Sequence, residues 1–491
     1  MDYNVKLKRD RFRPSTAPKE TFDDEMESDR GRAINSAAVR RLQQKTQVFP
    51  LESNSAVRSR LTHSLEVQQV GRFISKLILK KIKQRGELKT LGLDGKEDGF
   101  ISAVEIACLL HDIGNPPFGH FGEEAINHWS KKKLKKIFVD KFGKSITDSE
   151  IFKDLMIFEG NAQAIRLLHS IQELNLTFSQ VACLIKYTRS AHESKPGEND
   201  DFFYRKKKPG YYFSEKDYVS KLCNSLQIDL GCRFPLAYIM EAADDISYCI
   251  ADLDDAIDKK ILNVEQLHEA ICNTWQSFGS ELGVSQDIVD KGYLPRIAQD
   301  AYVRCGSETH NKSHAYILTL RTKLINDLAN YASDRYLDNH QAVFDGSLDE
   351  SLLDGNDEYN LATETLKTVA KKYVFSAKEV ERLELKGHAI ISGLLNIYTP
   401  LLELGFDEFK VLSTNDVLKS YQVETRLYHG LSNKQKRMYI DSTKYLFDKE
   451  NISEHEQALE LYFRARLLID YVSGMTDRFA LEEYRSLSAI G

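Results

Sequence analysis

Two short segments carry side chains that could bind a metal ion and act on a phosphate ester. His111 and Asp112 are adjacent at the end of an apolar stretch, directly before a turn rich in glycine and proline. Arg60 and His63 lie three residues apart in a segment further upstream. Imidazole and carboxylate ligands together suit Mn, Fe, Co, Ni or Zn, and also Mg when water fills more of its shell. A guanidinium beside the ion would bind phosphate oxygens, so metal-dependent phosphate ester hydrolysis is indicated.

A further metal ligand must come from a more distant carboxylate. The segment 238–255 contains five aspartates among mostly apolar residues. Asp244, Tyr248 and Asp252 recur at intervals of four residues, so they share one face of a helix. A helix this apolar is expected to be largely buried, and buried carboxylates need a metal or hydrogen-bond partners. We therefore predict Asp244 as the further ligand, with Tyr248 and Asp252 facing the substrate.

Helices are expected to position these residues. The apolar residues of segment 101–110 recur at helical spacing directly before His111. Glycines and prolines then interrupt the pattern between residues 114 and 119. His120 and Glu123 follow at a spacing of three, at the start of another helix, where they would share a face.

The composition favours a helical cytoplasmic protein. The chain has 491 residues, of which 42% are hydrophobic and 29% are charged, with a net charge of −6. Ten prolines and 26 glycines are few for this length, which favours an all-α fold. The seven cysteines are scattered, as in reduced intracellular proteins. The N-terminal residues lack the apolar core of a signal peptide, and no apolar run approaches the roughly 18–20 residues of a membrane span. We therefore expect a cytoplasmic protein with no membrane attachment.

The sequence resembles the bacterial deoxyguanosinetriphosphate triphosphohydrolases (dGTPases), a branch of the HD superfamily of metal-dependent phosphohydrolases. The similarity runs from about residue 25 to the C-terminus. It rests on Arg60-Leu-Thr-His63, on His111-Asp-Ile-Gly-Asn-Pro-Pro-Phe-Gly-His120 and on segments 27–36, 40–50, 158–163, 184–188, 208–212, 241–248 and 470–477. The resemblance implies an all-α fold and the cleavage of dGTP, or of other dNTPs, into the deoxynucleoside and intact tripolyphosphate.

The resemblance also assigns roles to individual residues. It implies His63, His111, Asp112 and Asp244 as metal ligands. It implies His120 and Glu123 as the catalytic pair. Residues near the substrate would be Gln47, Arg60, Asn161, Lys186, Tyr187, Tyr248 and Asp252, with Gln43 and Gln44 close to the first of these.

Cofactor, partners and domains follow from the same resemblance. We expect one divalent ion per subunit, Mn or Mg, with Co, Ni and Fe as alternatives. We expect a homo-oligomer, by resemblance a hexamer, that can bind single-stranded DNA. The predicted organisation is a polar N-terminal arm (1–25), an HD-domain core (26–345) and a helical C-terminal region packed on the core (346–491).

Two other functions remain open from the residues. An HD phosphomonoesterase or phosphodiesterase would need only the metal ligands, whereas His120 and Glu123 favour a longer phosphate chain. A nucleotide-sensing protein that binds single-stranded DNA would use a basic segment such as 205–208, which aromatic residues flank. A loop that holds neighbouring subunits together near an oligomer interface would explain the composition of segment 205–208 equally well. All predicted ligands are present, which favours the triphosphohydrolase.

Overall fold

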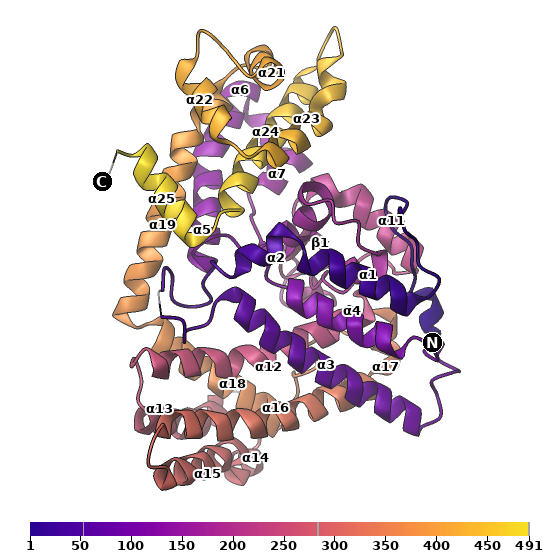
Figure 1. Cartoon of the computed structure of the whole chain (residues 1–491), viewed down its shortest axis with the longest axis vertical. Helices are drawn as coiled ribbons and strands as arrows, with labels where there is room; N and C mark the ends of the chain where they lie inside the picture. Colours follow the sequence, from indigo (N-terminus) through magenta and orange to yellow (C-terminus); the bar gives the residue numbers. More distant parts are fainter. Residues whose placement is uncertain (53, 282–283, 490–491) are drawn as a thin grey trace.

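Helices dominate the computed structural model of the chain, which describes residues 1–52, 54–281 and 284–489 (Figure 1). The two strands that it records, β1 (Arg189–Ser190) and β2 (Pro209–Tyr211), pair in parallel. The predicted all-α fold is therefore confirmed.

The helices of the N-terminal half, in chain order, are α1 (Phe22–Ile34), α2 (Ala37–Leu42), α3 (Arg60–Gln84), α4 (Glu97–Leu110), α5 (Gly119–Trp129), α6 (Lys135–Phe142), α7 (Glu150–Leu155), α8 (Gly160–Arg166), α9 (Phe178–Ala182), α10 (Phe203–Lys206), α11 (Lys216–Leu226) and α12 (Pro235–Asp258). Those of the C-terminal half are α13 (Val264–Glu281), α14 (Gln286–Lys291), α15 (Tyr293–Ser307), α16 (Lys312–Asp338), α17 (His340–Asp345), α18 (Glu358–Val369), α19 (Lys378–Tyr398), α20 (Pro400–Glu403), α21 (Phe406–Asn415), α22 (Gln422–Gly430), α23 (Asn433–Phe447), α24 (Glu454–Ser473) and α25 (Asp477–Leu487). Short 3₁₀ segments cover Tyr3–Val5, Lys144–Asp148 and Phe213–Glu215, and π-helical turns cover Ser130–Leu134, Leu167–Ile171 and Ala370–Phe375.

Two hydrophobic cores lie at opposite ends of the long axis (Figure 1). Helices α3, α4 and α12 pack together in the first core, and α13, α15, α16 and α18 extend it. The second core joins α5, α6 and α7 to the much later helices α19–α24. Each core draws on segments from both sides of residue 345, and the proposed division into domains stays a prediction.

Local sequence signals set the start of the two helices that matter most for the site. Ser59 caps α3: its hydroxyl accepts a hydrogen bond from the Thr62 backbone, while the Thr62 side chain accepts one from the Ser59 backbone. This reciprocal capping fixes the first turn, which carries Arg60 and His63. Helix α12 begins with Pro235, whose fixed φ and missing N–H suit the first helical position.

The N-terminal segment is irregular but anchored. Its Tyr3 side chain is fully buried, and the Tyr3 hydroxyl lies 2.7 Å from the Tyr336 hydroxyl and 3.0 Å from His340 Nε2. Lys6, three residues later, is also buried and donates to the Gln227 carbonyl at 2.6 Å, whereas Arg9 and Asp10 lie at the surface.

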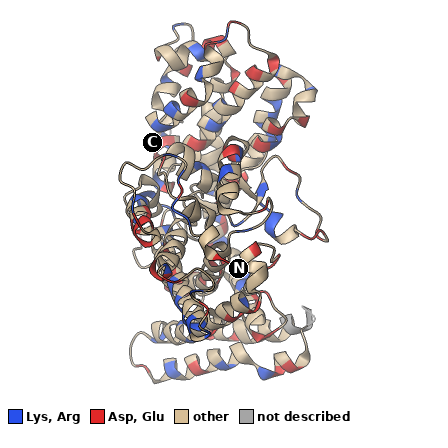
Figure 2. Cartoon of the chain, turned by 90° about the vertical axis from the view of Figure 1, so that its right-hand side faces the viewer, with Lys and Arg blue, Asp and Glu red and all other residues tan. Residues whose placement is uncertain are grey.

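The positions of basic and acidic residues alternate along the ribbon of Figure 2, with both kinds present in every part of that view. This agrees with the small negative net charge. In the described ranges, no helix alone is long and apolar enough to cross a membrane. The pair Lys378–Glu403 and Phe406–Asn415, bent by 105°, meets the criterion jointly by length and composition only.

Candidate active site

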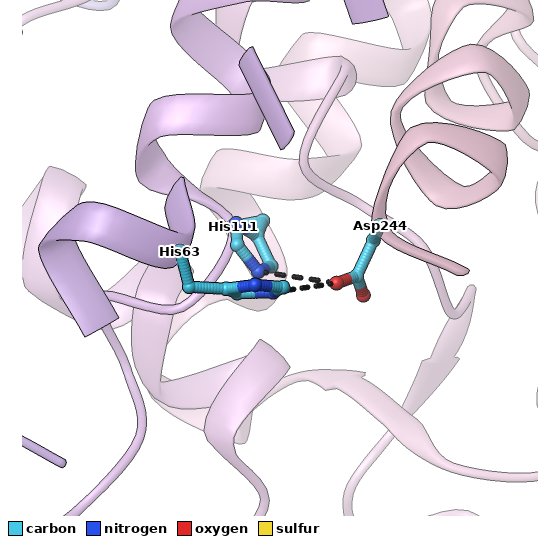
Figure 3. Close-up of side chains that lie close together, drawn as sticks. All are labelled: His63, His111 and Asp244. Atoms are coloured by element: carbon cyan, nitrogen blue, oxygen red, sulfur yellow. Dashed lines mark hydrogen bonds and ion pairs between the residues drawn. The ribbon is translucent and has the colours of Figure 1, made fainter. Parts of the chain in front are cut away.

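Three predicted metal ligands converge from three separate elements. His63 lies in the first turn of α3, His111 directly follows α4, and Asp244 lies in α12. The Nε2 atoms of both histidines are 3.4 Å from Asp244 Oδ1 (Figure 3). One donor atom from each residue lies within 4.8 Å of the others, and the two imidazoles are almost completely buried. The folded chain therefore brings together the ligands that spacing alone left far apart.

The geometry of this cluster fits a divalent metal ion. His111 Nδ1 donates to the Cys108 carbonyl at 2.7 Å, which directs Nε2 toward Asp244. A backbone carbonyl bound to the second ring nitrogen is the usual way in which proteins orient a ligating histidine. Donors about 2.0–2.2 Å from one ion lie roughly 3–3.5 Å from each other, and Asp244 Oδ1 lies 3.4 Å from Nε2 of each histidine.

Asp112 borders the cluster but is held by other partners. Its Oδ2 accepts a hydrogen bond from Arg60 Nη1 at 2.6 Å and lies 3.5 Å from His111 Nε2. Its Oδ1 accepts from the Asn115 side chain. The role of Asp112 as a fourth ligand stays a prediction. Its contact with Arg60 places the guanidinium next to the cluster, where a phosphate would need it.

The cluster carries negative charge that favours a cation. Burial disfavours the charged form of His111, but the neighbouring carboxylates of Asp112 and Asp244 outweigh it and raise the His111 pKa to about 9. Lys186 Nζ lies 3.9 Å from Asp244 Oδ2 and 3.7 Å from Glu241 Oε1. Burial lowers the pKa of Lys186, but the Tyr187 side chain and then the carboxylates of Glu241, Asp245 and Asp244 outweigh it and raise that pKa, so this lysine stays charged beside the cluster.

His120 and Glu123 form a pair at the start of α5, as predicted from their spacing. His120 Nδ1 lies 3.3 Å from Glu123 Oε2, and Glu123 Oε1 accepts from the Gly160 backbone at 3.1 Å. The hydrogen bond to Glu123 raises the pKa of His120. The His120 side chain is 80% exposed, so its free Nε2 is open to a substrate.

Arg60 connects this pair to the metal cluster. A Cβ built on Gly119, the residue before His120, would lie 3.0 Å from Arg60 Nη2. The same guanidinium also binds Asp112. Arg60 therefore lies between the candidate metal-binding residues and the segment that begins the His120–Glu123 pair.

The predicted sugar site contains buried oxygens with unused hydrogen-bonding capacity. Among the described residues, neither carboxylate oxygen of Asp252 nor Gln47 Oε1 makes a well-aligned hydrogen bond, although these atoms are buried. Burial and the nearby Asp252 carboxylate raise the pKa of Tyr248, which keeps its phenol protonated. The Tyr248 phenol interacts with the Asp252 carboxyl group, whereas Gln47 Oε1 has no donor among the described residues. A buried acceptor without a donor is costly, and the hydroxyl group of a bound sugar would supply one.

Comparison with known proteins shows a match over essentially the whole chain. Residues 60–189 match the HD domain family, and residues 406–486 match the phosphohydrolase-associated domain. The deoxyguanosinetriphosphate triphosphohydrolase of Yersinia pestis (strain Pestoides F) is 45% identical, over 99% of this chain and 98% of the relative. The chain belongs to this family. Enzymes of the same name from Serratia proteamaculans (strain 568) and Enterobacter sp. (strain 638) are 45% and 44% identical, over 97% and 94% of each chain.

Family membership confirms the predicted resemblance and the prediction of a phosphohydrolase. HD domains are metal-dependent, and His63, His111 and Asp244 form the candidate site for the ion. The individual roles given to the site residues stay predictions. Asn161, for example, donates to Glu159 Oε1 at 2.7 Å at the start of α8.

Lys208 was not among the residues predicted for the site of this dGTPase. Lys208 directly precedes β2, while Lys186 and Tyr187 precede β1, so the strand pair brings these residues to one edge. The Lys208 ammonium lies 3.3 Å from Glu159 Oε2, and its charge acts on His120 and Tyr187. The signal was present in segment 205–208, which suggested a nucleic-acid contact or an interface clamp instead.

The turn between α24 and α25 holds the active-site segments in place. Asp477 Oδ1 accepts from the Phe118 backbone at 3.0 Å, directly before α5, and its Oδ2 accepts from the Thr46 backbone at 3.1 Å. The carbonyl of Ser473 accepts from Lys45 Nζ at 3.1 Å, and the same ammonium donates to the Asn115 carbonyl. In the sequence, segment 470–477 was notable only as a family motif. In the structure it positions the start of α5 and residues 45–46, directly before Gln47.

Proposed function

We propose that the chain hydrolyses dGTP to deoxyguanosine and tripolyphosphate with one divalent metal ion per subunit, Mn or Mg. The convergence of His63, His111 and Asp244 beside Arg60 carries this proposal, because a metal and a guanidinium together suit a phosphate ester. The name of the relatives supplies the nucleotide. The metal-binding cluster alone would also serve a phosphomonoesterase. The His120–Glu123 pair and the lysines at the strand edge favour the longer phosphate chain.

Each side chain has a defined task in the proposed reaction. A bound divalent ion would hold and polarise a phosphate oxygen. Arg60 would bind the α-phosphate, while Lys186 and Lys208 neutralise the rest of the triphosphate. Water attacks the α-phosphorus and the 5′ oxygen of the nucleoside leaves. His120, oriented by Glu123, is the proton-transfer residue of this exchange, because the ordinary pKa of a histidine side chain lies near working pH.

Product analysis tests this proposal. The metal-loaded protein should convert dGTP to deoxyguanosine and tripolyphosphate in equal amounts, measured by anion-exchange chromatography. The same assay with the other dNTPs and with GTP measures selectivity. Release of orthophosphate or pyrophosphate as the first product would contradict the proposal.

The oligomeric state rests on the resemblance, DNA binding rests on the resemblance and on the basic segment 205–208, and the cytoplasmic location rests on the composition and the N-terminal residues. On that basis we propose a cytoplasmic homo-oligomer, a hexamer, that also binds single-stranded DNA. Light scattering measures the number of subunits in the oligomer. Fluorescence anisotropy with a labelled oligonucleotide measures the binding of single-stranded DNA.

Glu123→Gln should shift the pH profile to lower pH. The Glu123 carboxylate stabilises the protonated imidazole of His120 and so raises its pKa. Loss of this charge lowers that pKa, and the inflection of kcat assigned to His120 should move in the acid direction. Glu124→Gln is the matched control, because the Glu124 carboxylate acts on His120 more weakly. An unchanged profile in Glu123→Gln would remove His120 from proton transfer.

Asp252→Ala should erase the preference for a 3′-hydroxyl group. The buried Asp252 carboxylate is the acceptor that we assign to this hydroxyl, and a lost buried hydrogen bond costs about 1–3 kcal/mol. The ratio of kcat/KM for dGTP and its 2′,3′-dideoxy analogue should therefore fall to near one. Tyr248, one turn before Asp252, should exclude the 2′-hydroxyl, so the unmodified protein should strongly prefer dGTP to GTP. Equal rates with GTP, or full discrimination in Asp252→Ala, would contradict this assignment.

A further inference from the structure

A cavity of about 420 Å³ lies outside the active site, against the α24–α25 turn. Its lining includes Arg41 of α2, Gln435 of α23, and Tyr471, Met475 and Phe479 from α24, the turn and α25. None of these residues belongs to the metal cluster, the catalytic pair or the predicted sugar site.

Arg41 brings a positive charge to this cavity without a negative partner. Its side chain is half-buried, and no carboxylate in the described part of the chain lies within ion-pair distance of it. Burial and the charge of Arg40 lower the pKa of Arg41, and no acidic group opposes them. A half-buried guanidinium without a carboxylate partner is stabilised when an anion binds to it.

Gln435 is a second, independent sign of a missing ligand. The residue is only 3% exposed, and its Oε1 is buried with no hydrogen-bond partner among the described residues. A Cβ built on Gly474 would lie 3.6 Å from Gln435 Nε2 and 3.7 Å from Arg41 Nη1. The Gln435 amide and the Arg41 guanidinium therefore both border the space that a side chain at position 474 would fill.

The remaining lining explains which anion would fit. Ser432 precedes α23 and makes no capping hydrogen bond through its side chain, so the first N–H groups of that helix add to the donors at the cavity. Tyr471 and Phe479 supply aromatic surface, and Phe479 is 46% exposed. Hydrogen-bond donors and aromatic rings in one lining match an organic phosphate with a planar body.

We propose that this cavity is a second binding site, which takes a phosphate monoester with a planar apolar body. The phosphate oxygens accept from the Arg41 guanidinium and from Gln435 Nε2, a P–OH group of the phosphate donates to the unpartnered Gln435 Oε1, and the body packs on Phe479 and Tyr471. Phosphate is favoured over carboxylate because it offers more acceptor oxygens to the guanidinium, the amide and the helix N-terminus together.

Methionine methyl signals test this proposal on the full-length, metal-loaded protein. The chain has only six methionines, and Met475 lines the cavity. In a protein labelled with ¹³C at the methionine methyl groups, the Met475 signal, assigned through Met475→Leu, should shift on titration with phenyl phosphate. Inorganic phosphate should shift it at higher concentrations, and benzoate should bind at least tenfold more weakly than phenyl phosphate. Benzoate binding as tight as phenyl phosphate binding would overturn the assignment to phosphate.

Three variants locate the binding. Arg41→Met should weaken the response of Met475 at least tenfold, whereas Arg40→Met, which removes the same charge one residue earlier, should leave it within twofold. Gln435→Glu should also abolish the response, because its carboxylate would occupy Arg41 from within the cavity, and should raise Tm. A Met475 signal that ignores phenyl phosphate, or that responds equally in Arg41→Met, would overturn the proposal. So would dissociation of the oligomer in Arg41→Met, which would make a second copy of the chain the partner of Arg41.

Discussion

Asp244→Asn is expected to remove the metal ion and to lower dGTP hydrolysis by roughly three orders of magnitude or more, because metal catalysis contributes several kcal/mol. Asp244 Oδ1 lies 3.4 Å from Nε2 of both His63 and His111, so it is the atom that the two histidines share as a neighbour. Asparagine keeps the shape of the side chain but loses its charge. Metal content after dialysis, measured by mass spectrometry, and kcat should fall together while the helical circular dichroism stays unchanged.

Asp245→Asn is the matched control for this variant. Asp245 is the next residue of α12, but its carboxylate lies 4.0 Å from Lys367 of α18 and does not contact the histidines. This control should retain stoichiometric metal and most of the activity. Stoichiometric metal and near-normal turnover in Asp244→Asn would show that the ion is held elsewhere.

His120→Ala should lower kcat by about 10²–10⁴, the usual contribution of general acid–base catalysis, with the metal retained. The exposed imidazole is fixed through Glu123 and makes no contact with the metal cluster, so its loss should leave the ligands in place. KM for dGTP should change little. Metal analysis and steady-state kinetics measure both quantities.

His128→Ala is the control on the same helix. His128 lies two turns further along α5, beside His388, and has no place in the proposed reaction. Its removal should leave kcat within a few fold. An effect of His120→Ala on KM alone would make His120 a binding residue.

The sequence was sufficient to predict the helical class, the family and three side chains that converge in the fold. Asp244 could be chosen among five aspartates because it starts a stripe with Tyr248 and Asp252, and in α12 these three side chains lie close enough for their charges to act on one another. Family resemblance supported the same choice. The helical class and the family could be predicted because they depend on helical periodicity and motif spacing, which are local properties of the sequence.

Other features could not be predicted because they depend on contacts between distant segments. The Asp477 carboxylate reaches Phe118, 359 residues earlier in the chain, and no local pattern indicates that pair. The place of Lys208 depends on the pairing of two very short strands, which leave almost no periodic signal. The packing of α5–α7 with the C-terminal helices is non-local in the same way.

Hydrolysis of dGTP in ¹⁸O-labelled water tests the central claim most directly. If water attacks the α-phosphorus and the 5′ oxygen leaves, mass spectrometry should find one ¹⁸O atom in the tripolyphosphate and none in deoxyguanosine. This labelled product should form with the metal-loaded protein and not with Asp244→Asn. Label in deoxyguanosine, or label in orthophosphate or pyrophosphate as the primary product, would contradict the account.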